Sequence, residues 1–169
     1  MSPKNIDNLY QDKFRFVLKK IPTAVFLGSE ANIPGISIQT QQVANPVNYI
    51  NVAGYKVYYE DFQFTFRVNE NLENYRELYN WIHGIGAPQT PLQFAQLNSE
   101  SKLVKSTGYN IKSDATLISL TTEGNLKLKI NFADMFPYSL SSINFNHATN
   151  TTVTATAAFK YLNYTFEEA

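Results

Sequence analysis

Residues 62–68 have the sequence FQFTFRV, in which every second position carries an aromatic or aliphatic side chain. Because neighbouring side chains of a β-strand point to opposite faces, this alternation predicts a strand with one buried apolar face and one polar face. It is the strongest alternation in the chain. It favours a fold made mainly of β-strands around a core of aromatic rings.

Three other stretches have the same period of two. Their apolar positions are Phe14, Phe16 and Leu18; Leu126, Leu128, Ile130 and Phe132; and, near the C-terminus, Val153, Ala155, Ala157, Phe159 and Tyr161. After Tyr161 the apolar positions shift by one, to Leu162, Tyr164 and Phe166. A shift of one residue moves the apolar side chains to the other face of a strand. We therefore expect a bulge or a change of sheet near Tyr161.

One segment has helical rather than strand periodicity. Between residues 71 and 83 the apolar positions are spaced by three or four, at Leu72, Tyr75, Leu78, Tyr79 and Ile82. This spacing predicts an amphipathic helix over about residues 71–84. We expect a single domain, residues 1–169, folded as a β-barrel or sandwich with this one flanking helix. A long loop is expected at about residues 86–114, where Pro and Gly occur among Ser, Asn, Gln and Thr.

The composition excludes several classes of protein. Hydrophobic residues make up 44% of the 169 positions and aromatic residues 14%, which is too much for a disordered chain. With 14 basic and 14 acidic side chains the formal net charge is zero, so the chain has no long-range attraction to nucleic acid. The N-terminal region has no apolar run longer than residues 24–27. This predicts synthesis in the cytoplasm and no membrane partner.

The sequence offers no convincing catalytic or metal-binding residues. It has no Cys, and its two His residues, His83 and His147, lack a partner at metal-ligand spacing. Glu60 and Asp61 are adjacent, so in a strand they point to opposite faces and do not converge on one substrate. We therefore expect a protein that is not an enzyme, with no catalytic, cofactor-binding or metal-binding residue and no cofactor.

A polar stretch, residues 39–49, is more extended than a small domain needs for its own core. It has Pro46 near its middle and continues into Asn51-Val52-Ala53-Gly54. Of the residues between positions 41 and 49, only Val43 and Val47 are suited to a core. Extended polar arms of this kind usually reach another chain, and a chain with many strands and few blocked edges favours neighbours that complete the sheet.

The order of these features resembles the tail-tube proteins of contractile-tailed bacteriophages. The resemblance rests on the series Asn32-Ile33-Pro34-Gly35, the polar arm, Asn51-Val52-Ala53-Gly54, and Glu60-Asp61-Phe62 at the start of the alternating strand. The helix ending near Asn80-Trp81 and the aromatic strand 159–164 fit the same family. The resemblance implies a tail-tube-like β-barrel or sandwich whose flanking helix packs Trp81 against the sheet.

The resemblance also implies a function. It predicts a structural virion protein of the phage tail, whose hexameric rings share one inner β-barrel and stack into the tube through which DNA is ejected. The implied partners are further copies of the chain, the tail sheath protein, baseplate tube-cap proteins and the tape-measure protein. The arm is expected to contact the adjacent ring, through Gln41, Val43, Asn45, Pro46, Val47, Asn48 and Tyr49.

Passage of DNA limits which residues can line such a tube. Each Lys or Arg that neutralises a phosphate adds salt-dependent affinity, and a ring repeats every exposed cation. The uncharged side chains of Thr152, Thr154 and Thr156 make the C-terminal strand the candidate for part of the lumen wall. DNA is then expected to pass without specific binding.

Three alternative functions remain open on the sequence alone. The first is a single-ring protein of the baseplate or tail end, either a tube initiator or a tail-completion protein. The second is the tube of a bacterial contractile injection system. The third, of another class, is a sugar-binding β-sandwich that uses its many Tyr, Phe and Asn residues.

Overall fold

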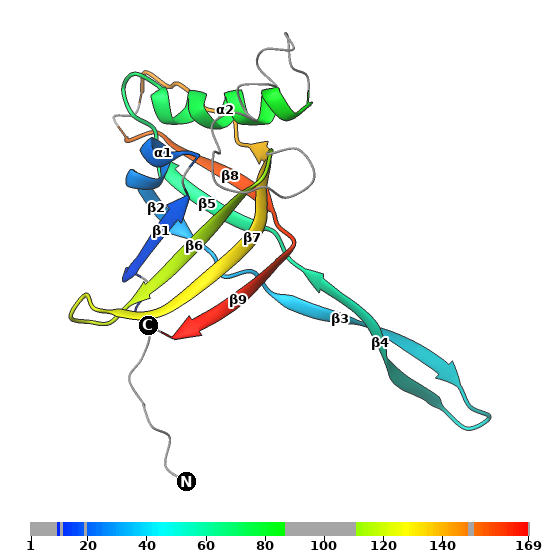
Figure 1. Ribbon diagram of the computed structural model, residues 1–169. Coiled ribbons are helices and arrows are strands. Elements are labelled where there is room, and N and C mark those ends of the chain that lie inside the picture. Colours follow the sequence, from blue (N-terminus) through cyan, green and yellow to red (C-terminus); the bar gives the residue numbers. More distant parts are fainter. Residues whose placement is uncertain (1–9, 11, 19, 87–110, 149–150, 169) are drawn as a thin grey trace.

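The computed structural model describes residue 10 and residues 12–18, 20–86, 111–148 and 151–168 (Figure 1). These residues form nine strands and two helices, in the order β1 (Phe14–Leu18), α1 (Pro22–Phe26), β2 (Gly28–Ala31), β3 (Ile36–Ala44), β4 (Tyr49–Tyr59), β5 (Phe62–Arg67), α2 (Glu73–Gly86), β6 (Ser113–Leu120), β7 (Leu126–Leu140), β8 (Thr154–Lys160) and β9 (Asn163–Glu168). The expected fold, mainly β with a barrel or sandwich architecture, is confirmed.

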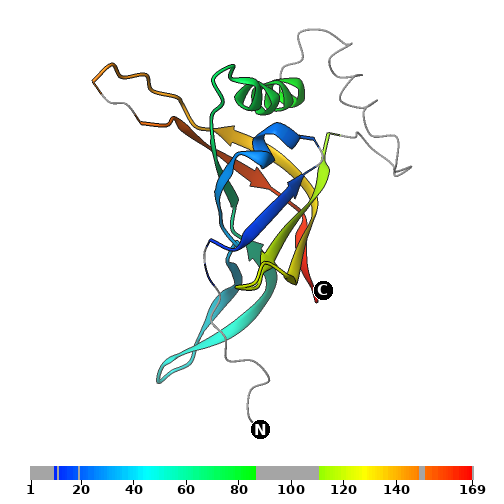
Figure 2. The same ribbon diagram turned by 90° about the vertical axis from the view of Figure 1, so that its left-hand side faces the viewer.

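Seven strands form one antiparallel sheet in the order β1-β6-β7-β8-β5-β2, with β9 paired to β7. The sheet curls on itself into an open barrel, and α2 lies across one end of it (Figures 1 and 2). Strands β3 and β4 pair only with each other and project from the opposite end. The molecule therefore consists of a barrel, a helix at one end and a hairpin at the other.

The alternating stretch 62–68 supplies the centre of the core. In β5 the side chains of Phe62, Phe64 and Phe66 are fully buried, whereas Gln63 and Arg67 are exposed. The ring of Phe16 from β1 packs against Phe62 and Phe64, with centroid distances of 5.0 and 4.9 Å. The register predicted from the sequence is thus confirmed.

The seven-stranded sheet has two sections, which are joined along β7, a strand of 15 residues that belongs to both. Its first part pairs with β6 and β9, and its second part pairs with β8. Asp134 has a φ of 56° between the two parts, where the strand changes direction. The C-terminal segment follows the same division, because β8 pairs with β5 while β9 pairs with the first part of β7. The chain crosses from one section of the sheet to the other at Tyr161 and Leu162. The change of sheet expected near Tyr161 is confirmed.

The predicted helix is α2, which begins at Glu73 and ends at Gly86. It buries Asn74, Leu78, Trp81 and Gly84 toward the barrel. The indole of Trp81 contacts the ring of Phe159 at 6.3 Å and donates a hydrogen bond to the carbonyl of Ile111 at 2.8 Å. This contact confirms that Trp81 packs against the sheet.

The structure also corrects the sequence analysis in two places. A second helix, α1, was not predicted; it has only five residues, too few for a periodic pattern, and buries Ala24. The loop expected at about residues 86–114 is shorter at both ends, because Gly86 belongs to α2 while Ser113 and Asp114 belong to β6. The remainder of that loop lies outside the described residues.

Candidate assembly surface

Strands β3 and β4 form a long antiparallel hairpin, which corresponds to the arm predicted from the sequence. Nine residues of β3 face eleven of β4, and the amide of Asn45 donates to the carbonyl of Asn48 at 2.9 Å to close the tip. Pro46 and Val47 lie at this tip. The residues of the predicted contact set, from Gln41 to Tyr49, are all exposed and lie along the outer half of the hairpin. The hairpin extends away from the barrel in both views (Figures 1 and 2).

The hairpin is rich in exposed apolar side chains and poor in charge. Among the described residues, twenty large hydrophobic side chains are exposed, and half of them lie on this hairpin: Ile36, Ile38, Val43, Val47, Tyr49, Ile50, Val52, Tyr55, Val57 and Tyr58. Lys56 is its one charged residue. Contiguous exposed apolar surface of this kind marks a site of protein association. An isolated two-stranded hairpin is only marginally stable in water, so this one needs neighbours.

An irregularity divides the hairpin into an inner and an outer half. The register runs from Ile38 opposite Val57 to Thr40 opposite Ala53, so residues 54–56 of β4 face only Gln39 of β3. Gly54 lies in this irregular part of β4, close to the backbone of Gln39. A Cβ atom at this position would lie 2.4 Å from the carbonyl oxygen of Gln39, a distance that no real side chain allows. Glycine is therefore required at the bend of the hairpin.

Backbone and amide hydrogen bonds fix the base of the hairpin. Asn32, in the turn before β3, donates from its side-chain amide to the carbonyl of Asp61 at 3.1 Å and accepts from the amide of Gln63 at 2.7 Å. The amide of Glu60 donates to the carbonyl of Gly35 at 3.0 Å. The predicted turn at residues 32–35 thus holds the two ends of the hairpin together.

Aromatic side chains from the corner between β8 and β9 brace the same base. The hydroxyl of Tyr161 donates to the carbonyl of Glu60 at 2.8 Å, and that of Tyr164 donates to the carbonyl of Pro34 at 3.2 Å. The ring of Tyr59 contacts both rings, at centroid distances of 5.8 and 5.5 Å. Partial burial raises the pKa of the Tyr161 hydroxyl well above its usual range, so it remains a hydrogen-bond donor.

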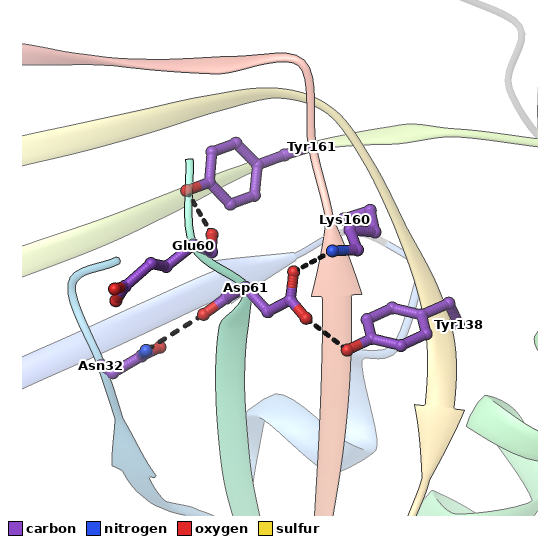
Figure 3. A network of polar contacts seen from close by, with 6 residues as sticks. All are labelled: Asn32, Glu60, Asp61, Tyr138, Lys160 and Tyr161. Atoms are coloured by element: carbon purple, nitrogen blue, oxygen red, sulfur yellow. Dashed lines mark hydrogen bonds and ion pairs between the residues drawn. The ribbon is translucent and has the colours of Figure 1, made fainter. Parts of the chain in front are cut away.

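A polar cluster around Asp61 ties the hairpin to the barrel wall (Figure 3). Its carboxylate accepts hydrogen bonds from Lys160 of β8 and from the hydroxyl of Tyr138 of β7. The hydrogen bond from Lys160, and then that from Tyr138, lower the pKa of the Asp61 carboxyl. Glu60 points away from Asp61, as expected for adjacent residues, so the two carboxylates do not form a catalytic pair. No local pattern in the sequence predicts this cluster, because Asp61 and Lys160 are 99 positions apart.

The three threonines proposed for a lumen wall lie at or before β8. Thr152 precedes the strand, Thr154 is its exposed first residue, and Thr156 is half-buried. The hydroxyl of Thr156 lies 3.0 Å from that of Thr65 on β5, so the two form a hydrogen bond across the strands. Arg67 lies opposite Thr154. This outward face of β5 and β8 is therefore uncharged at its centre, with Arg67 at one end and Lys160, which pairs with Asp61, at the other.

No cluster of three or more His, Asp or Glu side chains that could hold a metal ion occurs in the described part of the chain. His83 stacks on Tyr79 at 5.6 Å. Within the same residues, neither helix has the length and apolar character needed to cross a membrane.

Comparison with solved structures shows that this fold is known. The chain is similar to a protein in the sheath–tube complex of an extracellular contractile injection system, PVC, in its extended state, with 17% identity, coverage of 96% of this chain and 93% of the other, and a TM-score of 0.61. It is also similar to the tube terminating cap of the anti-feeding prophage, with 14% identity, coverage of 100% and 97%, and a TM-score of 0.65.

A third similar structure comes from the baseplate of the anti-feeding prophage, with 13% identity, coverage of 99% and 98%, and a TM-score of 0.56. Among curated proteins, none matches the chain. The family model described as phage tail tube protein matches residues 11–167, which is nearly the whole chain. The chain therefore belongs to the phage tail tube protein family.

Proposed function

We propose that this protein is a tail-tube subunit that assembles into hexameric rings, and that these rings stack into the conduit for DNA ejection. The observation that carries the proposal is the projecting hairpin, whose exposed apolar side chains have no cover within the described chain. It lies at the end of the barrel opposite α2, so copies stacked head to tail place each hairpin against the next ring.

Ring formation also accounts for the open strand edges. Within the described residues β1, β2 and β9 each pair with a single neighbouring strand, so each keeps one free edge. Free edges promote uncontrolled pairing with other chains, and closure of a ring of subunits removes them. The zero net charge of the chain leaves no long-range repulsion between copies.

The proposed lumen wall is the outward face of β5 and β8, with Thr154 and Thr156 facing the DNA and Thr152 at its margin. The hydroxyls of Thr65 and Thr156 form a hydrogen bond at the centre of this face, and its charged side chains lie toward its ends. An uncharged wall lets DNA pass without specific binding. By contrast, the outward side of β7 carries Lys127 and Lys129.

The proposed partners follow from the same assembly. They are further copies of this chain, a tail sheath protein around the tube, baseplate tube-cap proteins at its end and a tape-measure protein inside. This proposal is supported by the similarity to proteins of a sheath–tube complex, a tube terminating cap and a baseplate. The proposed location is the phage virion, after synthesis in the host cytoplasm, and the proposed role requires no catalysis.

A second candidate is a single ring that ends or starts a tube, in a phage or in a bacterial contractile injection system. The similarity to a tube terminating cap, at a TM-score of 0.65, favours it as much as the similarity to a tube at 0.61 favours the first. The sugar-binding alternative receives no support, because the β5 aromatics that alternate in the sequence are buried in the core.

Assembly of the purified protein tests the proposal. Sedimentation at rising protein concentration should show a transition from monomers to large assemblies, and negative-stain micrographs should show hollow tubes with six-fold end views. Isolated six-fold rings that never lengthen favour the cap. A strictly monomeric protein at every concentration contradicts both candidates.

A further inference from the structure

We infer that the two halves of the hairpin bind two different copies of this chain, the inner half a neighbour in the same ring and the outer half a copy in the next ring. The inference rests on the proposed function and adds to it an assignment of contacts. It follows from the strand register, which places the exposed Ile and Val side chains on opposite faces of the two halves.

In the outer half the exposed Ile and Val side chains of the paired strands share one face. Val43 pairs with Ile50, and Val52 lies on the same face opposite Gln41. These three side chains are 52%, 48% and 47% exposed, respectively. The other face carries Gln42 opposite Asn51 and, nearer the tip, Ala44 opposite Tyr49. Because paired residues of an antiparallel ladder share a face, the outer half presents these aliphatic side chains to a partner on one side.

In the inner half the exposed Ile and Val side chains lie on the opposite face. Here Ile38 pairs with Val57, and Ile36 pairs with Tyr59, whereas Tyr58 lies on the other face opposite Ser37. Ile38 and Val43 are five positions apart in an uninterrupted strand, so their side chains lie on opposite faces of the hairpin. The extra residues at 54–56 of β4 do not change this, because Val57 and Val52 are also an odd number of positions apart.

The two faces are suited to different neighbours. The inner face is continuous with the barrel, since Tyr59 contacts Tyr161 and Tyr164 at its base. A copy that covers it therefore also meets the side of the barrel, as a neighbour in the same ring does. The Val43–Ile50 pair lies seven residues further along β3 than Ile36, roughly 20 Å at the rise of an extended strand. That distance carries the outer face beyond the subunit's own barrel.

The charge of the hairpin fits further copies of the chain. Lys56 is the hairpin's one charged residue, and the whole chain has no net charge. Contact between copies therefore depends on apolar fit and leaves no unpaired row of charges.

Two double variants, each of which introduces a pair of opposite charges in one half of the hairpin, distinguish the two contacts. We replace the outer pair by Val43→Glu/Ile50→Lys and the inner pair by Ile38→Lys/Val57→Glu, each of which exchanges one Ile and one Val for a cross-strand ion pair. The control is Gln42→Glu/Asn51→Lys, which lies on the face of the outer half opposite to that of Val43 and Ile50. An opposite-charge pair supports the hairpin itself but is costly to bury in an apolar contact. Sedimentation and negative-stain microscopy then measure the share of protein in tubes, rings and monomers.

We expect the outer variant to stop at rings and the inner variant at monomers, while the control builds tubes like the wild type. In both variants the tube fraction should fall by about tenfold or more, because burial of charge weakens the contact. If both variants stop at the same species, or if either builds normal tubes, the inference is wrong while the tube function stands. A wild-type protein that builds neither rings nor tubes contradicts the proposed function itself.

Discussion

The hydroxyl of Tyr161 donates a hydrogen bond to the backbone carbonyl of Glu60 over 2.8 Å. This bond joins the corner where the C-terminal segment changes sheet to the residue where the hairpin returns to the barrel. Together with the bond from Tyr164 to Pro34, it holds both ends of the hairpin on the barrel. The direction in which the hairpin projects is therefore set by the core fold.

The aromatic core should dominate the stability of the barrel. Phe64 is fully buried between neighbouring rings, so Phe64→Ala should lower the free energy of unfolding by about 3–5 kcal/mol. Gln63→Ala is the matched control, because the side chain of Gln63 is exposed one position away on the same strand. Denaturant melts of the two variants measure the difference. Equal losses at the two positions are incompatible with the observed register of β5.

The Asp61 cluster should give the base of the hairpin a pH dependence. Because folding lowers the pKa of Asp61, its ionised form stabilises the folded state above the unfolded pKa of about 4, and this contribution is lost as the pH falls through the folded pKa. Wild type should therefore be more stable than Asp61→Asn from neutral pH down to about pH 5, and the difference should shrink below about pH 4.

Denaturant melts of both proteins across this pH range provide the measurement. Asp134→Asn is a suitable control, since Asp134 forms an exposed ion pair with Lys112 at 3.5 Å rather than with Lys160. A stability difference for Asp61→Asn that does not change between pH 7 and pH 3 rules out a role for the ionised carboxylate.

Gly54 should be needed for assembly rather than for folding of the barrel. In Gly54→Ala the new Cβ atom would lie 2.4 Å from the carbonyl oxygen of Gln39, so the two strands must separate at the bend. We expect an unchanged thermal unfolding temperature for the barrel but a loss of tubes in negative-stain micrographs. Gly86→Ala, where a Cβ atom meets nothing within 4 Å, should assemble normally. Normal tube formation by Gly54→Ala would contradict the prediction that assembly requires glycine at this position.

The proposed lumen wall predicts weak interaction with DNA. Wild-type assemblies should have little affinity for duplex DNA at physiological salt. Thr154→Lys should add salt-sensitive binding, because about 6–10 phosphate contacts make affinity fall roughly 10³–10⁵-fold between low and moderate salt. The double variant Arg67→Gln/Thr154→Lys keeps the wild-type number of cations and serves as the control. Tight binding by the wild type, with a steep salt slope in an anisotropy assay, argues against a conduit.

Most of what the sequence predicts about the barrel comes from the alternation of apolar and polar residues along each strand. The FQFTFRV stretch fixed both the existence of β5 and its buried face, and the parity change at Tyr161 marked the change of sheet. A similar change of parity separates Ile50 and Val52 from Val57, across the irregularity at residues 54–56.

Contacts between distant residues could not be predicted in the same way. Asp61 and Lys160 are 99 positions apart, and their ion pair depends on the pairing of β5 with β8. The apolar character of the hairpin is also difficult to predict, because its exposed Ile and Val side chains lie on opposite faces in the two halves and no single alternation runs through it.

Shortening the hairpin tests the central claim most directly. A variant in which residues 41–52 are replaced by Asn-Gly closes the ladder at Thr40 and Ala53 with a favoured two-residue turn. It removes the outer contact but leaves the barrel and its core intact. Negative-stain microscopy beside the wild type should show long tubes for the wild type and only unstacked rings for the variant, with the same thermal unfolding temperature. Tubes of wild-type length built by the shortened protein would contradict the account.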